Sequence, residues 1–258
     1  MAKDKTLIDR WIQAFDKDEG VYLLSPVDTT FEDEYVAVRR KEGRLLADDM
    51  VAQLPDIPGN HPLAREWKKR KESGERLVQY ITHWADPFIL EVGCGNGWLS
   101  NWLSSVATVV GIDINLLELK QAARVFERPS FCCGDLFQVA WDDSFGFDLI
   151  ILASSIQYFS DPHHTIETLM QLLAPSGEIH LIDSQIYPSV RSAKAAAIRS
   201  LKYFRDLAPG MTAKYYHHHT GLFDAFNHDY LLKPNRHLHA SVFRSKSGSP
   251  FPWIRIKK

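Results

Sequence analysis

Hydrophobic residues in the middle of the chain form short continuous runs that alternate with helical patterns. Runs that are apolar on both faces of a strand, separated by helices, indicate a parallel sheet covered by helices on both sides. We therefore predict an α/β fold with a doubly wound, mostly parallel sheet. The predicted strands are PFILEV (87–92), TVVGID (108–113), SFCCGD (130–135), FDLIILAS (147–154) and EIHLID (178–183).

Two helix starts can be placed between these strands. Asn115 is followed three residues later by Glu118, which is the spacing of a capping box. Asp161 precedes Pro162, so an N-cap residue stands directly before a proline at the first helical position. We expect this second helix to continue through Leu173 and to end at the Pro-Ser-Gly turn that follows.

The last part of the chain carries a different pattern. A helical stretch at 190–207 ends before a Pro-Gly pair, and three later segments resemble strands joined by Gly, Ser and Pro turns. We expect two of the three to form an antiparallel hairpin at one sheet edge, and the pattern leaves open which two. The segments are FNHDYLL (226–232), LHASVF (238–243) and WIRIKK (253–258).

Residues 1–60 lack the strand–helix alternation, and we interpret them as an N-terminal extension to a main domain at 61–258. A helix at 62–84 would begin the main domain, with Trp67 on its apolar face and charges elsewhere. Within the extension we predict one helix at 6–15 and short strands at 21–25, 35–40 and 43–47.

Composition narrows the class of protein. The net charge is −2, without the basic surplus that is typical of nucleic-acid binding. Three cysteines, of which Cys132 and Cys133 are adjacent, form neither a disulfide framework nor a zinc motif. No apolar run approaches the roughly 20 residues of a membrane span. The charged N-terminus does not resemble a secretory signal. We expect a cytoplasmic protein with no membrane or nucleic-acid partner.

The strongest motif is EVGCGNG, which has glycines at every second position from Gly93 to Gly97. It ends the first strand of the main domain, at the sheet edge where open α/β folds bind ligands. A dinucleotide fingerprint would need glycine at position 98, which is Trp98, and no P-loop lysine follows. The glycines therefore indicate the close approach of a ligand that is not a dinucleotide.

Two acids end the next two predicted strands. Asp113 lies twenty residues after Gly93, where a carboxylate can accept hydrogen bonds from a ribose diol. Asp135 follows Gly134 and can accept from the exocyclic amine of an adenine. Together these positions predict an adenosine ligand without phosphates.

This combination resembles the class I S-adenosylmethionine-dependent methyltransferases over roughly residues 60–258. The motifs that carry the resemblance are EVGCGNG, VVGIDIN, CCGDLF, FDLIILASSIQYF and LLAPSGEIHLID, where Ser176 replaces a glycine that is usual in the family. The resemblance implies a Rossmann-like, seven-stranded sheet with an antiparallel C-terminal edge strand. It also implies S-adenosyl-L-methionine as cofactor and S-adenosyl-L-homocysteine as product.

The resemblance further implies which residues hold the cofactor. The glycine loop would meet its methionine part, Asp113 its ribose and Asp135 its adenine, while the helix at 62–84 resembles a lid. The implied cofactor-binding residues are Glu91, Gly93, Cys94, Gly95, Asn96, Gly97, Asp113, Ile114, Asp135, Leu136, Ala153, Ser154, Trp67 and Arg70.

Candidates for an acceptor-side base come from segments near the same sheet edge. We single out Tyr158, Tyr187 and His218, although the tyrosines also suit pocket walls. Gln157 lies in the same region, and Asp183 can equally brace a strand end. Three adjacent histidines at 217–219 cannot easily point at one ion, so we predict no metal.

The sequence therefore predicts methyl transfer from S-adenosylmethionine to a small-molecule acceptor. Residues 1–60 and 185–225 would shape the acceptor pocket. One alternative is a protein or RNA methyltransferase on the same fold, although ASSIQYF stands where nucleic-acid amino-methylating enzymes often carry (N/D)PP(Y/F). Another is a non-catalytic domain that binds the cofactor as a sensor, which a sealed acceptor pocket would favour.

Overall fold

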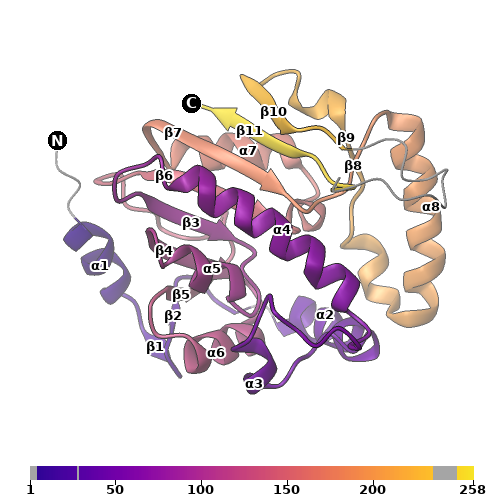
Figure 1. Ribbon diagram of the computed structural model, residues 1–258, viewed down its shortest axis with the longest axis horizontal. Coiled ribbons are helices and arrows are strands. Elements are labelled where there is room, and N and C mark those ends of the chain that lie inside the picture. The colour runs from indigo at the N-terminus through magenta and orange to yellow at the C-terminus, as the bar shows by residue number, and fades with distance from the viewer. Residues whose placement is uncertain (1–4, 28, 235–248) are drawn as a thin grey trace.

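The computed structural model describes residues 5–27, 29–234 and 249–258. Its centre is a nine-stranded sheet in the order β1-β2-β5-β4-β3-β6-β7-β11-β10, and β8 and β9 form a separate parallel pair (Figure 1). The strands are β1 (Lys17–Asp18), β2 (Val21–Leu23), β3 (Phe88–Val92), β4 (Thr108–Asp113), β5 (Ser130–Cys133), β6 (Phe147–Ala153), β7 (Leu173–Ile182), β8 (Ile186–Tyr187), β9 (His218–His219), β10 (His228–Leu232) and β11 (Trp253–Lys257).

The predicted mostly parallel sheet is confirmed. From β2 to β7 all neighbouring strands are parallel. The predicted C-terminal hairpin is formed by the segments 226–232 and 253–258, because β10 pairs antiparallel with β11 and β11 with β7. The predicted antiparallel C-terminal edge strand is present as β10, which lies outside β11. The third segment, 238–243, lies outside the described residues.

Helices cover both faces of the sheet, as the doubly wound pattern predicts. In Figure 1, α4, α5 and α6 lie in front of the strands, and α1 and α7 lie behind them. The helices are α1 (Lys5–Gln13), α2 (Thr29–Lys41), α3 (Asp48–Val51), α4 (Ala64–Ile81), α5 (Trp98–Leu103), α6 (Leu116–Val125), α7 (Pro162–Gln171) and α8 (Val190–Leu207), with short 3₁₀ helices η1 (Ile156–Tyr158), η2 (Pro209–Ala213) and η3 (Thr220–Phe223).

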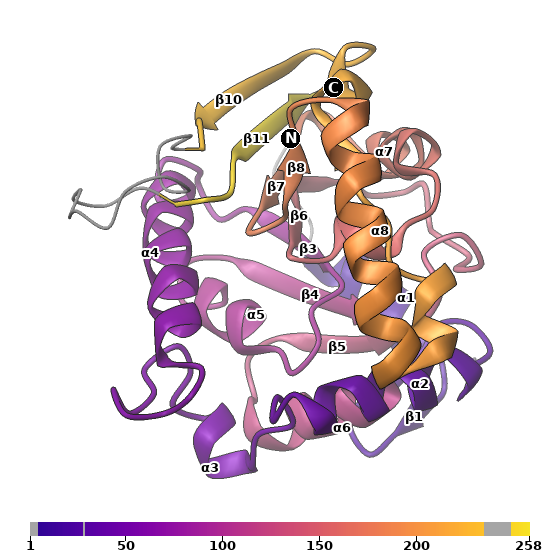
Figure 2. The same cartoon turned by 90° about the vertical axis from the view of Figure 1, so that its right-hand side faces the viewer.

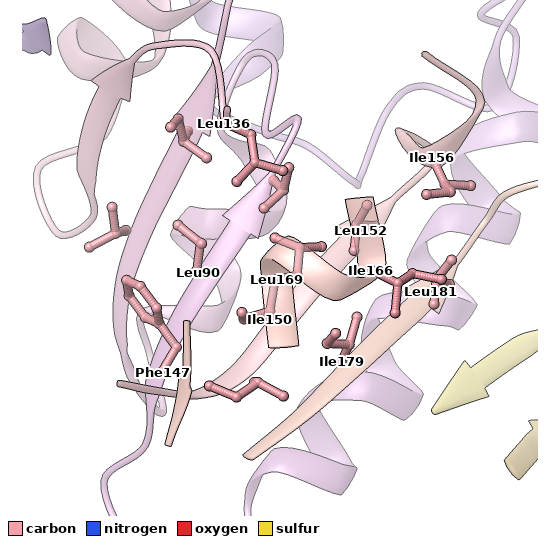
Figure 3. Packing of buried hydrophobic residues seen from close by; sticks show 14 of the residues in the cluster. Leu90, Leu136, Phe147, Ile150, Leu152, Ile156, Ile166, Leu169, Ile179 and Leu181 are labelled. Carbon is pink, nitrogen blue, oxygen red and sulfur yellow. The ribbon is translucent and has the colours of Figure 1, made fainter. Parts of the chain in front are cut away.

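Each face of the sheet has its own apolar core. On the rear face, Ile150 of β6 belongs to one buried cluster with Ile166 and Leu169 of α7 (Figure 3). On the front face, Leu77 of α4 shares a second cluster with Leu149 of β6. Burial of apolar surface on both faces stabilises the sheet and fixes the position of its carboxyl edge. No helix in the described ranges is both long and apolar enough to cross a membrane.

Both predicted helix starts are confirmed. The Asn115 side chain accepts a hydrogen bond from the Glu118 N–H at 3.2 Å, and the Asp161 side chain accepts one from the His164 N–H at 3.0 Å. The second helix is shorter than predicted, because α7 ends at Gln171 and the chain then enters β7. The Phe147 N–H at the start of β6 donates to the Leu172 carbonyl, so the chain after Gln171 pairs with the sheet.

The N-terminal segment differs most from the prediction. The segment 35–40, predicted as a strand, is helical and lies within α2, and 43–47 forms no strand. The valines suggest β-structure, but tertiary packing overrides this propensity. Tyr35, Val38 and Glu42 follow helical spacing and all line one cavity. The short strands β1 and β2 extend the main sheet beyond β5, so in the described part of the chain it has nine strands and not the seven predicted.

Two helices from opposite ends of the chain lie beyond the carboxyl edge of the sheet. Figure 2 shows α8 and α2 in front of the strand ends. Val38 of α2 packs in one small apolar cluster with Phe204 of α8 and Met211 of η2. The cluster joins segments that are more than 160 residues apart into a single cap over the strand ends.

Candidate functional site

The glycine loop follows β3, and its three glycines have three different surroundings. All have positive φ, of +77° at Gly93, +52° at Gly95 and +72° at Gly97. A Cβ at Gly93 would overlap Ser155, and one at Gly97 would lie 2.5 Å from Phe131 Cζ. At Gly95 the nearest atom would be 3.7 Å away. Packing within the protein therefore requires two of the glycines, and Gly95 alone presents a bare backbone to open space.

Asp113 lies beside this loop at the end of β4. Its carboxylate accepts hydrogen bonds from the Gly95 N–H at 2.8 Å and from the Asn115 N–H at 2.9 Å. Burial raises the pKa of Asp113 to about 6, although these donors favour its charged form. One acid therefore both orders the loop and presents negative charge at the predicted ribose position.

Glu91 lies under the loop, within β3. Its side chain is buried and accepts a hydrogen bond from Ser100 Oγ at 2.5 Å. Burial raises the pKa of Glu91 to about 8. The side chain therefore links the end of the strand to the first turn of α5 largely as a neutral group near neutral pH.

The predicted adenine residues lie at the ends of the next strands. Asp135 accepts hydrogen bonds from the Phe137 N–H and from Gln138 Nε2, so its carboxylate already has local partners. Leu136 is buried in the rear core, and Ile114 follows Asp113 directly. The structure brings Asp113 and the glycine loop together, whereas Asp135 stands on the neighbouring strand end.

A small cavity of about 70 Å³, which we call the loop hollow, lies over the glycine loop. It contains most of the predicted cofactor residues together with Tyr35 and Arg39 of α2, which the sequence reasoning missed. The helical spacing within 35–42 was the available signal. The lining residues are Tyr35, Arg39, Arg44, Leu46, Leu63, Glu66, Trp67, Arg70, Glu91, Gly93, Cys94, Gly95, Asn96, Trp98, Ala153 and Ser154.

An ion pair joins Arg39 of α2 to Glu118 of α6. Arg39 Nη2 lies 3.0 Å from Glu118 Oε1, and the Glu118 side chain is only 3% exposed. Asn115 Nδ2 donates to the other oxygen of this carboxylate at 3.1 Å. The buried carboxylate therefore has both a charged and a polar partner, as buried acids require.

Helix α4 carries Trp67 and Arg70 to the loop hollow. Trp67 is buried and packs edge-on against Trp98, with ring centroids 5.2 Å apart. Arg70 lies over the Trp67 ring at 5.4 Å and pairs with Glu66 at 3.1 Å. The second half of the helix packs on the sheet through Leu77. Its first half therefore lines the site while its second half holds it in place.

A larger cavity of about 760 Å³, the acceptor-side cavity, adjoins the loop hollow and shares Ser154 and part of α4 with it. Its walls come from α2, α4, α8 and the strand ends. The lining residues are Tyr35, Val38, Arg39, Glu42, Arg44, Pro62, Leu63, Arg65, Glu66, Lys69, Arg70, Ser154, Gln157, Tyr158, Asp183, Arg199, Ser200, Tyr203, Phe204, Met211, Tyr215 and Phe251.

Of the three base candidates, Tyr158 lines this cavity, and Tyr187 and His218 do not. Burial raises the pKa of Tyr158 well above its usual range, so at neutral pH the side chain stays a protonated phenol and cannot accept a proton on its oxygen as a phenolate would. The ring of Tyr187 lies beside that of His217. A His218 ring nitrogen contacts the Ile156 carbonyl at 3.0 Å.

The adjacent histidines point to different partners. His217 Nε2 lies 2.9 Å from Ser200 Oγ, whereas the His218 ring faces the Ile156 carbonyl. Within the described part of the chain, no group of three His, Cys, Asp or Glu side chains is arranged to hold a metal ion.

The sequence of this chain is similar to those of known methyltransferases. Residues 90–181 match the family model of a methyltransferase domain. Malonyl-[acyl-carrier protein] O-methyltransferase of Priestia megaterium is 28% identical over 131 residues, which are 48% of this chain and 47% of the relative. Trans-aconitate 2-methyltransferase of Yersinia pseudotuberculosis is 29% identical over 134 residues, 50% of this chain and 51% of the relative. The chain thus matches about half the length of these relatives.

A solved structure extends the similarity to most of the fold. Magnesium protoporphyrin IX methyltransferase from Synechocystis PCC 6803, which was solved with its cofactor bound, superposes with a TM-score of 0.55. The match covers 91% of this chain and 99% of that one at 13% identity. At this identity the likeness concerns the fold alone.

Proposed function

Because the chain carries a methyltransferase domain of the class I S-adenosylmethionine-dependent family, we propose that the protein transfers the methyl group of S-adenosylmethionine to a small-molecule acceptor. A cytoplasmic location and the absence of a nucleic-acid partner belong to the same proposal. The near-neutral net charge of −2 supports the absence of a nucleic-acid partner.

One observation carries this proposal. The loop hollow and the acceptor-side cavity share lining residues of α2 and α4, and they also share Ser154, which follows the last residue of β6. A cofactor whose methionine part lies on the glycine loop would direct its methyl group toward the larger space. Enzymes of this kind gain much of their rate from holding the two reactants in line.

The residues present suit the cofactor. Gly95 offers open space above a backbone with positive φ, and Asp113 offers a carboxylate beside it. The bound cofactor would supply the electrophilic methyl group, and this chain would supply position and electrostatics. Trp67 and Arg70 would close one side of the site, and Tyr35 and Arg39 the other.

The loop hollow is smaller than the roughly 300–1,000 Å³ of ordinary ligand pockets. Tyr35 and Arg39 contribute its wall from α2, so we propose that these side chains move outward when the cofactor enters. Side-chain rearrangement of this kind is common on binding.

A methyltransferase is favoured over a sensor by the acceptor-side cavity. A sensor needs no space beyond the cofactor, whereas this cavity has about 760 Å³ and lies next to the loop hollow. The named substrates of the curated relatives, malonyl-[acyl-carrier protein] and trans-aconitate, support an acceptor other than nucleic acid.

Calorimetry with S-adenosylmethionine and S-adenosylhomocysteine, followed by transfer of a tritiated methyl group to a panel of small molecules, tests the proposal. We expect both ligands to bind one site, and label to appear in a low-mass product. Binding without transfer to any compound, together with an unchanged cofactor after long incubation, would favour the sensor.

A further inference from the structure

Two neighbouring strands end in unusual backbone at the floor of the acceptor-side cavity. Ser154 follows β6 with φ +59°, and Asp183 follows β7 with φ +54°. The Ser154 N–H donates to the Ile182 carbonyl at 2.9 Å, so the two turns lie side by side. Left-handed backbone at residues other than glycine is uncommon and tends to occur at functional sites.

The Asp183 side chain is buried but only half satisfied. It is 8% exposed, and its Oδ1 accepts a hydrogen bond from Ser73 Oγ at 2.6 Å. Its Oδ2 has no hydrogen-bond partner within the described residues, and the residue lines the cavity. Buried carboxylate oxygens are normally paired, so this solvent-shielded oxygen lacks a partner, which a ligand that reached it could supply.

Gln157 also lines this cavity and carries a second buried acceptor without a partner among the described residues. Its Nε2 donates to the Ser154 carbonyl at 2.5 Å, which fixes the amide so that Oε1 is the other atom. Oε1 is buried and has no hydrogen-bond partner in the part of the chain that the structure describes. Two acceptors in one cavity require hydrogen-bond donors from whatever binds there.

We propose that Asp183 is the proton acceptor of the methyl transfer, and that the methyl acceptor therefore carries its proton on the reacting atom, as an alcohol, phenol or amine does. Gln157 would hold a second donor of the same molecule. This inference rests on the proposed function and names the substrate class for it.

The methyl transfer needs only the cofactor, the acceptor and the Asp183 carboxylate. The acceptor oxygen or nitrogen forms the new bond to the methyl carbon, and the electron pair of the broken carbon–sulfur bond stays on sulfur. The proton of the acceptor passes to Asp183 Oδ2, so one positive sulfonium and one carboxylate charge disappear together. No metal or redox partner is needed.

The charges around Asp183 suit this role. Burial raises the pKa of Asp183, which brings it closer to neutral pH, where a general base is most effective. Arg70 and Arg76 of α4 oppose this shift, and Glu66 of the same helix adds to it. Ser73 fixes the carboxylate through Oδ1 and leaves Oδ2 directed away from that bond.

Asp183→Asn is the informative variant. Asparagine tolerates left-handed backbone and retains an oxygen for Ser73, so the fold should persist, whereas alanine would add strain. Asp148→Asn is the matched control, because Asp148 is also buried but lies at the amino end of β6, away from the cavity. Its carboxylate accepts a hydrogen bond from the Phe88 N–H.

The first arm measures transfer of tritiated methyl groups to phenols, alcohols and primary amines, alongside the methyl ethers, tertiary amines and sulfides of the same skeletons. We expect label only in compounds with a transferable proton. Asp183→Asn should lower kcat by about 100-fold or more, since general-base catalysis contributes about 10²–10⁴-fold. Cofactor affinity should not change, and the acidic limb of the kcat–pH profile should disappear.

A second arm does not depend on turnover. Nuclear magnetic resonance titration of the S-adenosylhomocysteine-saturated protein compares 4-methylphenol with 4-methylanisole. We expect the phenol to shift cavity resonances at lower concentration, with this preference lost in Asp183→Asn and kept in Asp148→Asn.

The outcomes separate the two proposals. Failure to bind cofactor would overturn the proposed function. Cofactor binding with equal or no response to the two probes would overturn the role of Asp183 instead. Asp183→Asn with kcat within about threefold of the wild type, or a best substrate lacking a proton, would also overturn that role.

Discussion

The carboxylate of Asp113 accepts a hydrogen bond from the backbone N–H of Gly95 at 2.8 Å. The strand end that would hold the ribose and the loop that would hold the methionine part are therefore joined without any ligand. If this carboxylate also binds the ribose, substitution by asparagine or alanine can separate the effect of its charge from the effect of its hydrogen bonds.

Replacement of Asp113 should weaken cofactor binding at least about tenfold, since a hydrogen bond to a charged group contributes about 1.5–3 kcal/mol. Asp113→Ala removes the ribose acceptor and the loop contact, whereas Asp113→Asn keeps an oxygen for Gly95. We expect calorimetry to show the larger loss for alanine, with both variants folded by circular dichroism. Wild-type affinity in Asp113→Ala would rule out a ribose contact.

Cofactor affinity should also depend on pH. The pKa of Asp113 is raised to about 6, and ribose hydroxyls donate better to the charged carboxylate. Ligand binding should therefore lower this pKa, so affinity is highest above about pH 7 and falls through about pH 6. Calorimetry over this pH range measures how cofactor affinity changes with pH. The same pH dependence in Asp113→Asn would assign the effect to another titrating group.

Substitutions at two glycines of the loop should affect cofactor binding and thermal stability to different extents. Gly95→Val places its side chain where the cofactor would lie, so it should abolish binding with a modest loss of thermal stability. Gly97→Val forces a side chain against Phe131 and should lower the melting temperature more. Normal binding by folded Gly95→Val would mean that the loop serves packing alone.

Glu91→Gln should stabilise the protein at alkaline pH. The folded-state pKa of Glu91 is raised to about 8, above the unfolded value of about 4.3, so the native state binds more protons between these values. Wild-type stability therefore falls as pH rises through this window, and the glutamine variant avoids that loss. At about pH 9 we expect its melting temperature to exceed wild type by a few degrees, with no gain at about pH 4.

The exposed Glu75→Gln serves as the control for Glu91→Gln. It should not change the melting temperature at either pH, because an exposed carboxylate loses little hydration on folding. A pH-independent gain in Glu91→Gln would attribute the effect to packing.

Trp67 should contribute to both stability and cofactor binding. It packs on Trp98 in the front core and also lines the loop hollow. Trp67→Ala should therefore lower the free energy of unfolding by about 3 kcal/mol and weaken cofactor affinity in the protein that remains folded. Trp102→Ala is the control, since Trp102 packs on Gly74 and lines neither cavity. Unchanged affinity in folded Trp67→Ala would leave Trp67 a packing role only.

The sequence predicted the parts of the fold whose causes are local. Apolar runs gave β3, β4 and β6 close to their observed bounds, and the caps at Asn115 and Asp161 are present. Residues 35–40 were assigned wrongly because two valines favour a strand locally, whereas in the folded protein the segment is helical and packs against α8 and η2. These contacts cross more than 160 residues, so no local pattern contains them.

The site shows the same division. The glycine loop and Asp113 follow from motif and strand order, but the roles of Tyr35 and Arg39 depend on where α2 docks. The free oxygens of Asp183 and Gln157 depend on which neighbours each atom meets. Such pairings are properties of the assembled fold.

The cap formed by α2 and α8 has a consequence for how relatives of this chain should be sorted. The recognisable methyltransferase domain covers residues 90–181, and of the residues that line the acceptor-side cavity it contains Ser154, Gln157 and Tyr158. The other walls come from before and after it. Proteins that share the domain can therefore share a cofactor while diverging freely in substrate, and only agreement in the flanking segments would mark two of them as the same enzyme.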